Sequence, residues 1–183
     1  MRIAVVGDIH GEIACLKNAL DNLNTRNIDA VFSTGDLVDT EQNAKEIISL
    51  CRQGKIISVK GNHDEMTAEC SKCDPDSKAY LARLPFSFGF RVFGWSITII
   101  HGSQSKNTEY LYEDSPATQH FLDNADENSV LVCGHTHIPY IKNRGSAYVM
   151  NPGSISRPKA PAHPSYLILE LTPSGLGSDL IML

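Results

Sequence analysis

The chain has 183 residues, of which 42% are apolar and 20% are charged, and its formal net charge is −5. This is the composition of an ordinary globular protein, which excludes a fibrous or largely disordered chain. A chain of this length can bury roughly 70% of its unfolded surface in one core, so we expect residues 1–183 to form a single domain. Because the basic residues are scattered, long nucleic acid is a poor candidate for a partner.

Apolar segments are short throughout the chain. None approaches the roughly 20 residues that a membrane-spanning helix needs. The first apolar run, residues 3–6, is too short for the core of a signal peptide. We therefore expect a cytoplasmic protein without a membrane segment.

The cysteines are odd in number, five in all. Cys15, Cys51 and Cys133 lie in apolar stretches, where free thiols behave as small apolar residues. Cys70 and Cys73 form a C-x-x-C pair, but no second pair completes a zinc site. We expect these two to be reduced cysteines at the surface.

The N-terminal third of the chain alternates between apolar runs and helical patterns. Residues 3–6, 30–33 and 56–59 are short apolar runs, typical of buried strands. Between them, apolar residues recur with helical spacing over residues 12–23 and 43–51. Strands that alternate with helices favour a parallel sheet with right-handed crossovers, in which a ligand site lies at the carboxyl ends of the strands.

The second half reads as short strands separated by turns. An antiparallel pair is expected at residues 86–93 and 95–100, on either side of Gly94. A helix is expected to begin at Ser115-Pro116, because proline is tolerated at the first helical position. Further expected strands are residues 130–133, 138–142, 147–150, 166–171 and 180–182, and the Pro-rich stretch 157–164 is expected to be a mobile loop.

Phenylalanines cluster in the expected antiparallel pair, at Phe86, Phe88, Phe90 and Phe93. Their spacing of about two residues favours the core of a two-sheet sandwich over a surface that binds a partner subunit. The sequence does not predict an oligomeric state.

Polar clusters follow five of the expected strands. They are Gly7-Asp8-Ile9-His10-Gly11, Gly35-Asp36-Leu37-Val38-Asp39, Gly61-Asn62-His63-Asp64, His101-Gly102 and Gly134-His135-Thr136-His137. Each cluster combines oxygen or imidazole donors with glycine, which lets the backbone turn tightly and approach a ligand. Because crowded carboxylates and imidazoles destabilise a fold unless a positive charge neutralises them, the pattern predicts a metal site.

Within two clusters, the donors stand two positions apart: Asp8 with His10, and His135 with His137. In a locally extended chain, each pair would point to the same side. Mixed imidazole and carboxylate ligands suit Mn, Fe, Zn, Ni or Co rather than calcium. Single histidines outside the clusters, His120 and His163, are expected to have no part in the site.

The ordered motifs GDIHG, GDLVD, GNHD, HG and GHTH resemble those of the calcineurin-like metallophosphoesterase superfamily, over residues 8–137. The resemblance implies an α/β fold, a four-layer α/β/β/α sandwich of two mixed sheets with helices on both outer faces. It also implies a dinuclear metal site at the strand carboxyl ends, with Mn²⁺ the first choice and Ni, Fe, Zn or Co as alternatives.

In that family, the metal ions are held in two sets of four ligands. The resemblance assigns Asp8, His10, Asp36 and His137 to the first ion, and Asp36, Asn62, His101 and His135 to the second. Asp36 would then bridge the ions, which a carboxylate can do because its two oxygens can ligate separately. Two such ions can hold a bridging hydroxide for in-line attack on a phosphoester.

The same resemblance assigns the remaining roles. His63 would be the catalytic residue that binds the phosphate and assists the leaving oxygen, with Asn62 also binding substrate. Asp39 would orient His63 from behind. Asp64 is expected to be a local cap or turn residue.

The branch of the family is indicated by smaller features. Asn151-Pro152-Gly153-Ser154 is similar to a turn of the small bacterial and archaeal phosphodiesterases, although Ser103 stands where many of them have histidine. Protein phosphatases and dinucleotide hydrolases carry Arg-Gly after the second motif, where this chain has Thr40-Glu41. That arginine would grip a phosphate with two hydrogen bonds, so its absence favours small phosphodiester substrates.

Three alternatives remain open from the sequence. They are a phosphomonoesterase, a protein or dinucleotide phosphatase, and a non-catalytic scaffold of the same fold that binds metal.

Overall fold

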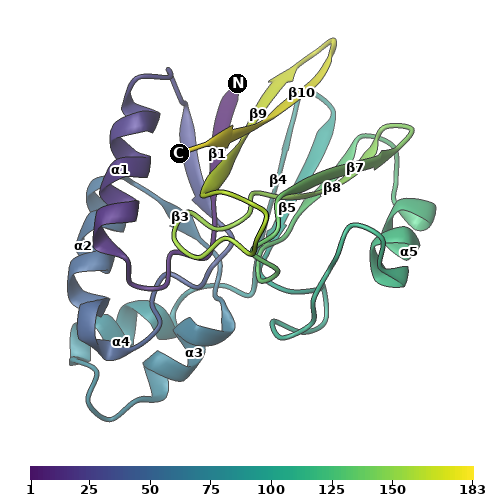
Figure 1. Cartoon of the computed structure of the whole chain (residues 1–183). Coiled ribbons are helices and arrows are strands. Elements are labelled where there is room, and N and C mark those ends of the chain that lie inside the picture. The colour runs from purple at the N-terminus through teal and green to yellow at the C-terminus, as the bar shows by residue number, and fades with distance from the viewer.

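Two five-stranded sheets stacked face to face form the centre of the computed structural model, which describes residues 1–183 (Figure 1). In spatial order, the first sheet consists of β10 (Gly175–Met182), β9 (Ser165–Thr172), β1 (Arg2–Val6), β2 (Ala30–Ser33) and β3 (Ile57–Ser58). The second consists of β4 (Ser87–Val92), β5 (Trp95–Ile100), β6 (Ser129–Val132), β8 (Ala147–Asn151) and β7 (Tyr140–Arg144). Both sheets are mixed.

Helices cover the outer faces of both sheets (Figure 1). They are α1 (Ile13–Asn24), α2 (Ala44–Gln53), α3 (Asn62–Glu69), α4 (Pro75–Ala82) and α5 (Pro116–Asn124), with a 3₁₀ turn, η1, at Glu41–Asn43. The first two pack on the first sheet and α5 packs on the second, so the expected α/β/β/α sandwich is confirmed. None of the helices is long and apolar enough to cross a membrane.

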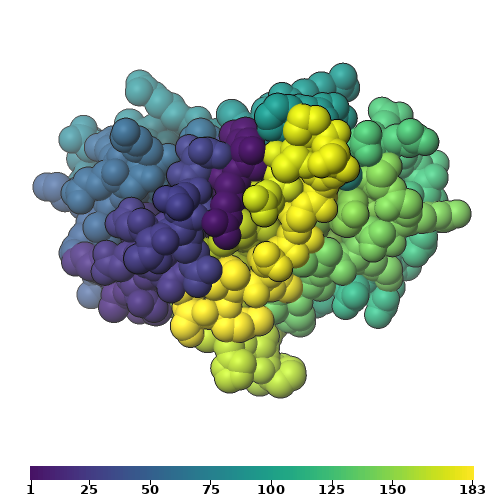
Figure 2. All heavy atoms as spheres, turned by 90° about the horizontal axis from the view of Figure 1, so that it is seen from above, coloured from purple at the N-terminus to yellow at the C-terminus, as the bar shows by residue number.

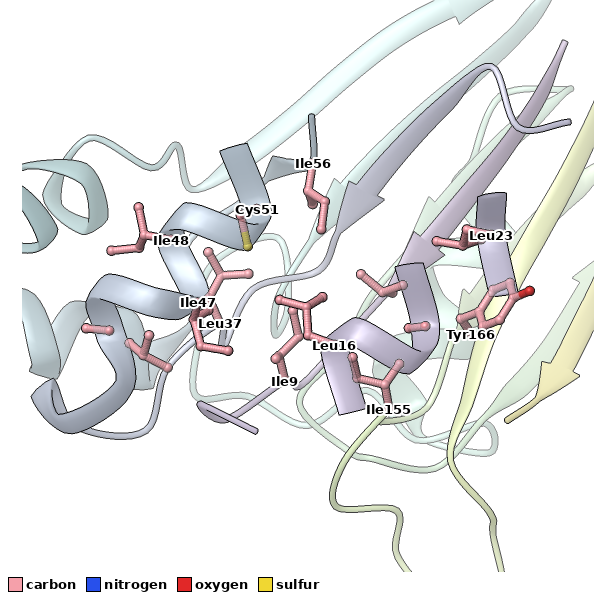
Figure 3. Close-up of a cluster of buried hydrophobic side chains, with 14 of the residues drawn as sticks. Ile9, Leu16, Leu23, Leu37, Ile47, Ile48, Cys51, Ile56, Ile155 and Tyr166 are labelled. Carbon is pink, nitrogen blue, oxygen red and sulfur yellow. The ribbon is translucent and has the colours of Figure 1, made fainter. Parts of the chain in front are cut away.

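Strand β1 is apolar from Ile3 to Val6 because both of its faces are buried. Ala4 and Val6 pack on one side against the helices, in the cluster drawn in Figure 3 with Leu16 and Ile47. Ile3 and Val5 point to the other side, into the core between the sheets. Because alternate residues of a strand point to opposite faces, a strand buried on both faces needs apolar residues throughout.

The C-terminal hairpin of β9 and β10 forms one edge of the first sheet. Strand β1 pairs in parallel with β2 and antiparallel with β9, so residues from both ends of the chain lie side by side. In Figure 2, the yellow C-terminal residues lie between the purple N-terminal strand and the green segment of the second sheet.

Several elements differ from the sequence-based prediction. Helices α3 and α4 were not predicted, because few of their residues are buried and they carry little apolar periodicity. Strand β10 begins at Gly175 rather than at residue 180, since its half-exposed edge position requires little apolar character. Residues 157–164 form no helix or strand, and their mobility stays a prediction.

The phenylalanine prediction is correct for two of the four side chains. Phe88 and Phe90 pack against the buried Phe32, with ring centroids 5.6 and 5.3 Å away. Phe86 and Phe93 remain exposed, because they lie outside the strand and do not share its inward face.

All five cysteines are free. Cys51 and Cys133 are buried as expected. The expectation of a surface position is wrong for Cys73, which is buried against the apolar core beneath α2 and α4. Cys70 is half-buried beside it.

Replacing Leu16 with alanine should lower the free energy of unfolding by about 2–5 kcal/mol, because Leu16 is fully buried between α1 and the first sheet. The matched control is Asn18→Ala on the exposed face of the same helix, which should leave stability unchanged or slightly higher. Urea unfolding followed by circular dichroism measures both. Equal losses in the two variants would contradict the assigned packing.

Candidate metal centre

Seven polar side chains from both sheets meet at one place. Asp8 and His10 follow β1, Asp36 follows β2, Asn62 begins α3, His101 follows β5, and His135 and His137 follow β6. Strand β1 runs from the N-terminus at the top of Figure 1 toward the middle of the molecule. The parallel strands of each sheet run the same way, which is why their polar ends converge.

The first group of donors is Asp8, His10 and His137, whose ligand atoms all lie within 4.8 Å of one another. Nε2 of His137 lies 3.0 Å from Nε2 of His10 and 3.5 Å from Oδ1 of Asp8. Three atoms with lone pairs therefore face a common point.

The second group is centred on His101, which is fully buried. Its Nε2 lies 3.0 Å from Oδ1 of Asn62 and 3.1 Å from Nδ1 of His135. Oδ2 of Asp36 lies 3.3 Å from the same nitrogen. This group is again a set of nitrogen and oxygen donors around one point.

Asp36 lies between the two groups. Its Oδ2 is 3.8 Å from Nε2 of His10 and 3.3 Å from Nε2 of His101. Its Oδ1 accepts a hydrogen bond from the backbone N–H of His63 at 2.9 Å. One oxygen therefore faces both groups and the other is occupied, which differs from the expected use of one oxygen for each group.

Two of the histidines are oriented so that Nε2 faces the other donors, which is an arrangement that suits metal cations. Nδ1 of His101 lies 2.9 Å from the carbonyl oxygen of Thr34, and Nδ1 of His137 lies 2.7 Å from that of Arg157. Because a carbonyl can only accept, each Nδ1 carries the proton. In the neutral imidazoles, both Nε2 atoms then present bare lone pairs to other acceptors, an arrangement that a cation stabilises.

Electrostatics in the metal-free chain also demand positive charge. Burial raises the pKa of Asp8 to about 7. Burial opposes the charge of His101, yet the adjacent Asp36 carboxylate outweighs it and raises the pKa of His101 to about 9. Burial lowers the pKa of His10 and of His135 to about 4, which keeps both neutral and able to ligate at neutral pH.

The backbone at these donors is left-handed rather than extended. Asp8, His10, Asp36, His135 and His137 have φ angles between 47° and 66°. The expectation of extended pairs at the first and last motifs is therefore wrong. Each such residue costs roughly 1 kcal/mol or more, and strain of this kind gathers at functional sites.

Glycine lets the loops of the centre approach one another closely. A Cβ on Gly61 would overlap the carboxylate and backbone nitrogen of Asp36. A Cβ on Gly134 would lie 2.5 Å from Oγ1 of Thr34. Side chains at either position would push apart the loops that carry the donors.

Asn151, the last residue of β8, and the serines that follow it hold the loops of the first and last motifs in place by hydrogen bonds. Nδ2 of Asn151 donates to the carbonyl of Gly134 at 2.8 Å and to Oγ1 of Thr136 at 3.0 Å. The hydroxyls of Ser154 and Ser156 both donate to the carbonyl of Asp8. The Asn-Pro-Gly-Ser turn thus holds the first and last motifs together, a role that its sequence did not disclose.

His63 lies beside the first group, with its ring centroid 4.9 Å from that of His10. Its Nδ1 is 2.8 Å from Oδ1 of Asp39, as expected for an orienting carboxylate. Nη1 of Arg157 lies 3.1 Å from the other Asp39 oxygen. Partial burial opposes the charge of Asp39, but the hydrogen bond and charge of Arg157 lower its pKa.

Arg157 was not predicted as part of the site. Its only sequence signal is its position three residues after Ser154, in a stretch without periodicity. Its backbone amide donates to Oγ of Ser154 at 2.8 Å, which brings its carbonyl to His137 and its guanidinium to Asp39.

Other expectations about single residues are resolved by their contacts. Asp64 is buried and accepts hydrogen bonds from the backbone amides of Gly61, Leu37 and Val38, as expected for a cap. Ser103 accepts from the amides of Ser105 and Lys106, so it stabilises its own turn. His120 and His163 are exposed, and neither belongs to the donor groups.

A family model described as the calcineurin-like phosphoesterase superfamily domain matches residues 1–174. The chain belongs to this superfamily, as its five ordered motifs indicated.

Relatives are distant over the whole chain. Phosphodiesterase YfcE of Escherichia coli is 24% identical over an alignment of 182 positions, which spans 93% of this chain and 88% of YfcE. Serine/threonine-protein phosphatase 2 of Escherichia coli is 41% identical over 68 residues, only 37% of this chain and 31% of that protein. A solved structure of a hypothetical protein from Pyrococcus horikoshii has a TM-score of 0.81 at 16% identity, covering 100% of this chain and 87% of that one. The last similarity is one of fold.

Binding of Mn²⁺ should release protons at about pH 7, because His101 and part of Asp8 are protonated in the metal-free chain. As pH falls from about 9 to about 6, both groups gain protons that compete with the metal, so the apparent affinity should fall. Calorimetry in buffers of different ionisation enthalpy counts the released protons. An affinity that does not change over this range would contradict the assignment.

Proposed function

We propose that this protein hydrolyses small phosphodiesters with two divalent metal ions bound at the candidate metal centre. The observation that supports this most strongly is the pair of donor groups that share Oδ2 of Asp36. Asp8, His10, Asp36 and His137 would hold one ion, and Asp36, Asn62, His101 and His135 would hold the other. Imidazole with carboxylate suits Mn²⁺, which the family resemblance makes the first choice, as well as Ni, Fe, Zn or Co.

When bound, two such ions supply an activated water and positive charge that neutralises the phosphoryl oxygens. The chain's own contribution begins with His63. Because Asp39 occupies Nδ1, Nε2 is the ring nitrogen of His63 left for substrate, and in the imidazolium form its N–H would donate to the phosphate or to the leaving oxygen. Asn62, at the N-terminus of α3, would bind the phosphate next to His63.

The preference for diesters rests on smaller features. Thr40 follows Asp39 where phosphatases have arginine, and its hydroxyl accepts from the amide of Gln42. The guanidinium of Arg157, which lies beside the centre, is already paired with Asp39 and with Glu12. Arg157 is therefore not free to bind the terminal phosphate of a monoester. This agrees with a preference for diesters, the activity in the name of phosphodiesterase YfcE.

Two alternatives compete with this proposal. The local identity with serine/threonine-protein phosphatase 2 favours a phosphomonoesterase or a protein or dinucleotide phosphatase. A scaffold that binds metal without catalysis is the second, and the His63–Asp39 pair speaks against it, because a scaffold has no need of an oriented histidine beside the metal centre.

Asp36→Asn and His63→Ala should separate metal binding from catalysis. The first variant should lose bound metal, since both ions depend on Asp36. The second should keep its metal but lose about 10²- to 10⁴-fold in kcat on a chromogenic diester, because it lacks the proton donor. The measurements are metal content and turnover of bis-p-nitrophenyl phosphate.

His120→Ala is the matched control, since His120 is exposed and outside the donor groups. It should keep both metal and activity. If the wild type is as inert as the variants with Mn, Ni, Zn and Mg, the catalytic proposal is wrong and the scaffold is favoured.

The diester preference has its own test. The metal-loaded wild type should turn over bis-p-nitrophenyl phosphate with a higher kcat/KM than p-nitrophenyl phosphate, because no unpaired arginine is available to bind the additional phosphate charge. Faster turnover of the monoester would reverse the assignment and favour a phosphatase.

A further inference from the structure

A phosphodiester has two organic groups, and both must find room beside the metal centre. Near His63, the rim consists of the charged residues Asp39, Arg157 and Glu12. Near His135, the rim is aromatic instead. It is formed by Tyr110 and Tyr112, in the segment that leads from β5 to α5 (Figure 1).

The two tyrosines continue a stack that starts at the metal centre. The ring of Tyr110 lies 4.1 Å from that of His135, centroid to centroid, with 17° between the planes. The ring of Tyr112 lies 5.6 Å from that of Tyr110, again at 17°. We call this nearly parallel pair the aromatic ledge.

Much of the ledge faces solvent. Tyr110 is 45% exposed and Tyr112 is 42% exposed. Single exposed aromatic residues are common, but adjoining exposed rings next to a polar site are typical of a surface that receives a ligand. Stacking on aromatic side chains is how proteins bind nucleobases without reading their identity.

A positive charge accompanies the ledge. Nζ of Lys159 lies 5.0 Å from the centroid of the Tyr110 ring. The backbone amide of Lys159 donates to the carbonyl of His137 at 3.2 Å, which anchors the lysine beside the metal centre. An aromatic surface with an adjacent ammonium group complements an aromatic base that carries a phosphate.

We propose that the aromatic ledge is a base subsite, which takes the heteroaromatic base of a nucleoside phosphodiester while the phosphate lies at the metal centre. This inference rests on the proposed function and narrows its substrates to nucleotide diesters. The alternative is that the tyrosines only hold the His135 ring in place. Tyr110 alone would do this, so the alternative does not explain why Tyr112 extends the stack into solvent.

The first test compares two diesters with the same leaving group, thymidine 5′-(p-nitrophenyl phosphate) and methyl p-nitrophenyl phosphate. The metal-loaded wild type should favour the thymidine ester in kcat/KM by about 5- to 150-fold, mainly through KM. Tyr112→Leu should lose most of this preference, whereas Tyr112→Phe should keep it because the ring remains. Phe93→Leu, which removes an exposed ring in the β4–β5 turn, at the opposite end of β5 from His101, should also keep it.

The second test is binding without turnover, and it separates this inference from the proposed function. AMP should bind the metal-loaded protein at least about fivefold more tightly than ribose 5-phosphate, and Tyr112→Leu should remove the difference. If this difference is found but neither diester is hydrolysed, the proposed function fails and the base subsite stands.

Other outcomes overturn the base subsite. Equal binding of AMP and ribose 5-phosphate would do so, and so would binding of neither. A preference for the thymidine ester that survives Tyr112→Leu would place the base elsewhere.

Discussion

The carboxylates and imidazoles of the candidate metal centre point their lone pairs at one another where the parallel strands of both sheets end. Within the chain, only bound protons can offset the resulting repulsion. Asp8 and Asp36 form ion pairs with histidines and with no lysine or arginine. Burial raises the pKa of Asp8 to about 7, and no lysine or arginine lies close enough to offset it. Left-handed backbone at five donors adds strain to the same place. The apolar layers must offset both costs, and strands β1 and β6, which lead into the centre, are largely buried.

The rigidity of the centre comes from backbone carbonyls as much as from side chains. Thr34 and Arg157 each offer a carbonyl to one histidine and so determine which ring nitrogen can ligate. Ser154 and Ser156 hold the carbonyl of Asp8. The donors Asp8, His101 and His137, in the first, fourth and last motifs, are thus oriented by residues outside their own motifs, and each histidine is left with Nε2 facing the centre.

The family resemblance predicted the layers, and the donors singled out from the sequence lie together in the structure. Apolar runs that end in Gly-Asp or Gly-Asn-His mark where buried strands end, and the helical spacing in residues 12–23 and 43–51 matches α1 and α2 to within two residues at each end. Edge strand β10 and helices α3 and α4 were missed or shortened, because half-exposed elements carry little apolar pattern.

Features that depend on loop geometry were beyond sequence reasoning. Arg157 and Tyr110 reach the centre from segments without periodicity, and only the path of the chain reveals their neighbours. The left-handed conformation of Asp8 and His10 follows from the tight turn between β1 and α1, which spacing alone does not disclose. The seven donors were recognisable because Asp, Asn and His are unusual directly after apolar strands. A tyrosine or an arginine in a loop is common and gives no such signal.

The pairing of β1 with β9 has a consequence for how the centre forms during synthesis. Asp8 is made before residues 165–172, and β1 cannot be flanked on both sides until those residues have been made. The serines that hold the Asp8 carbonyl also lie near the end of the chain. A nascent chain that ends just after His137 therefore carries all seven donors without this support. Completion of the candidate metal centre therefore depends on pairing between segments that are distant along the chain, which is a slow kind of step in folding.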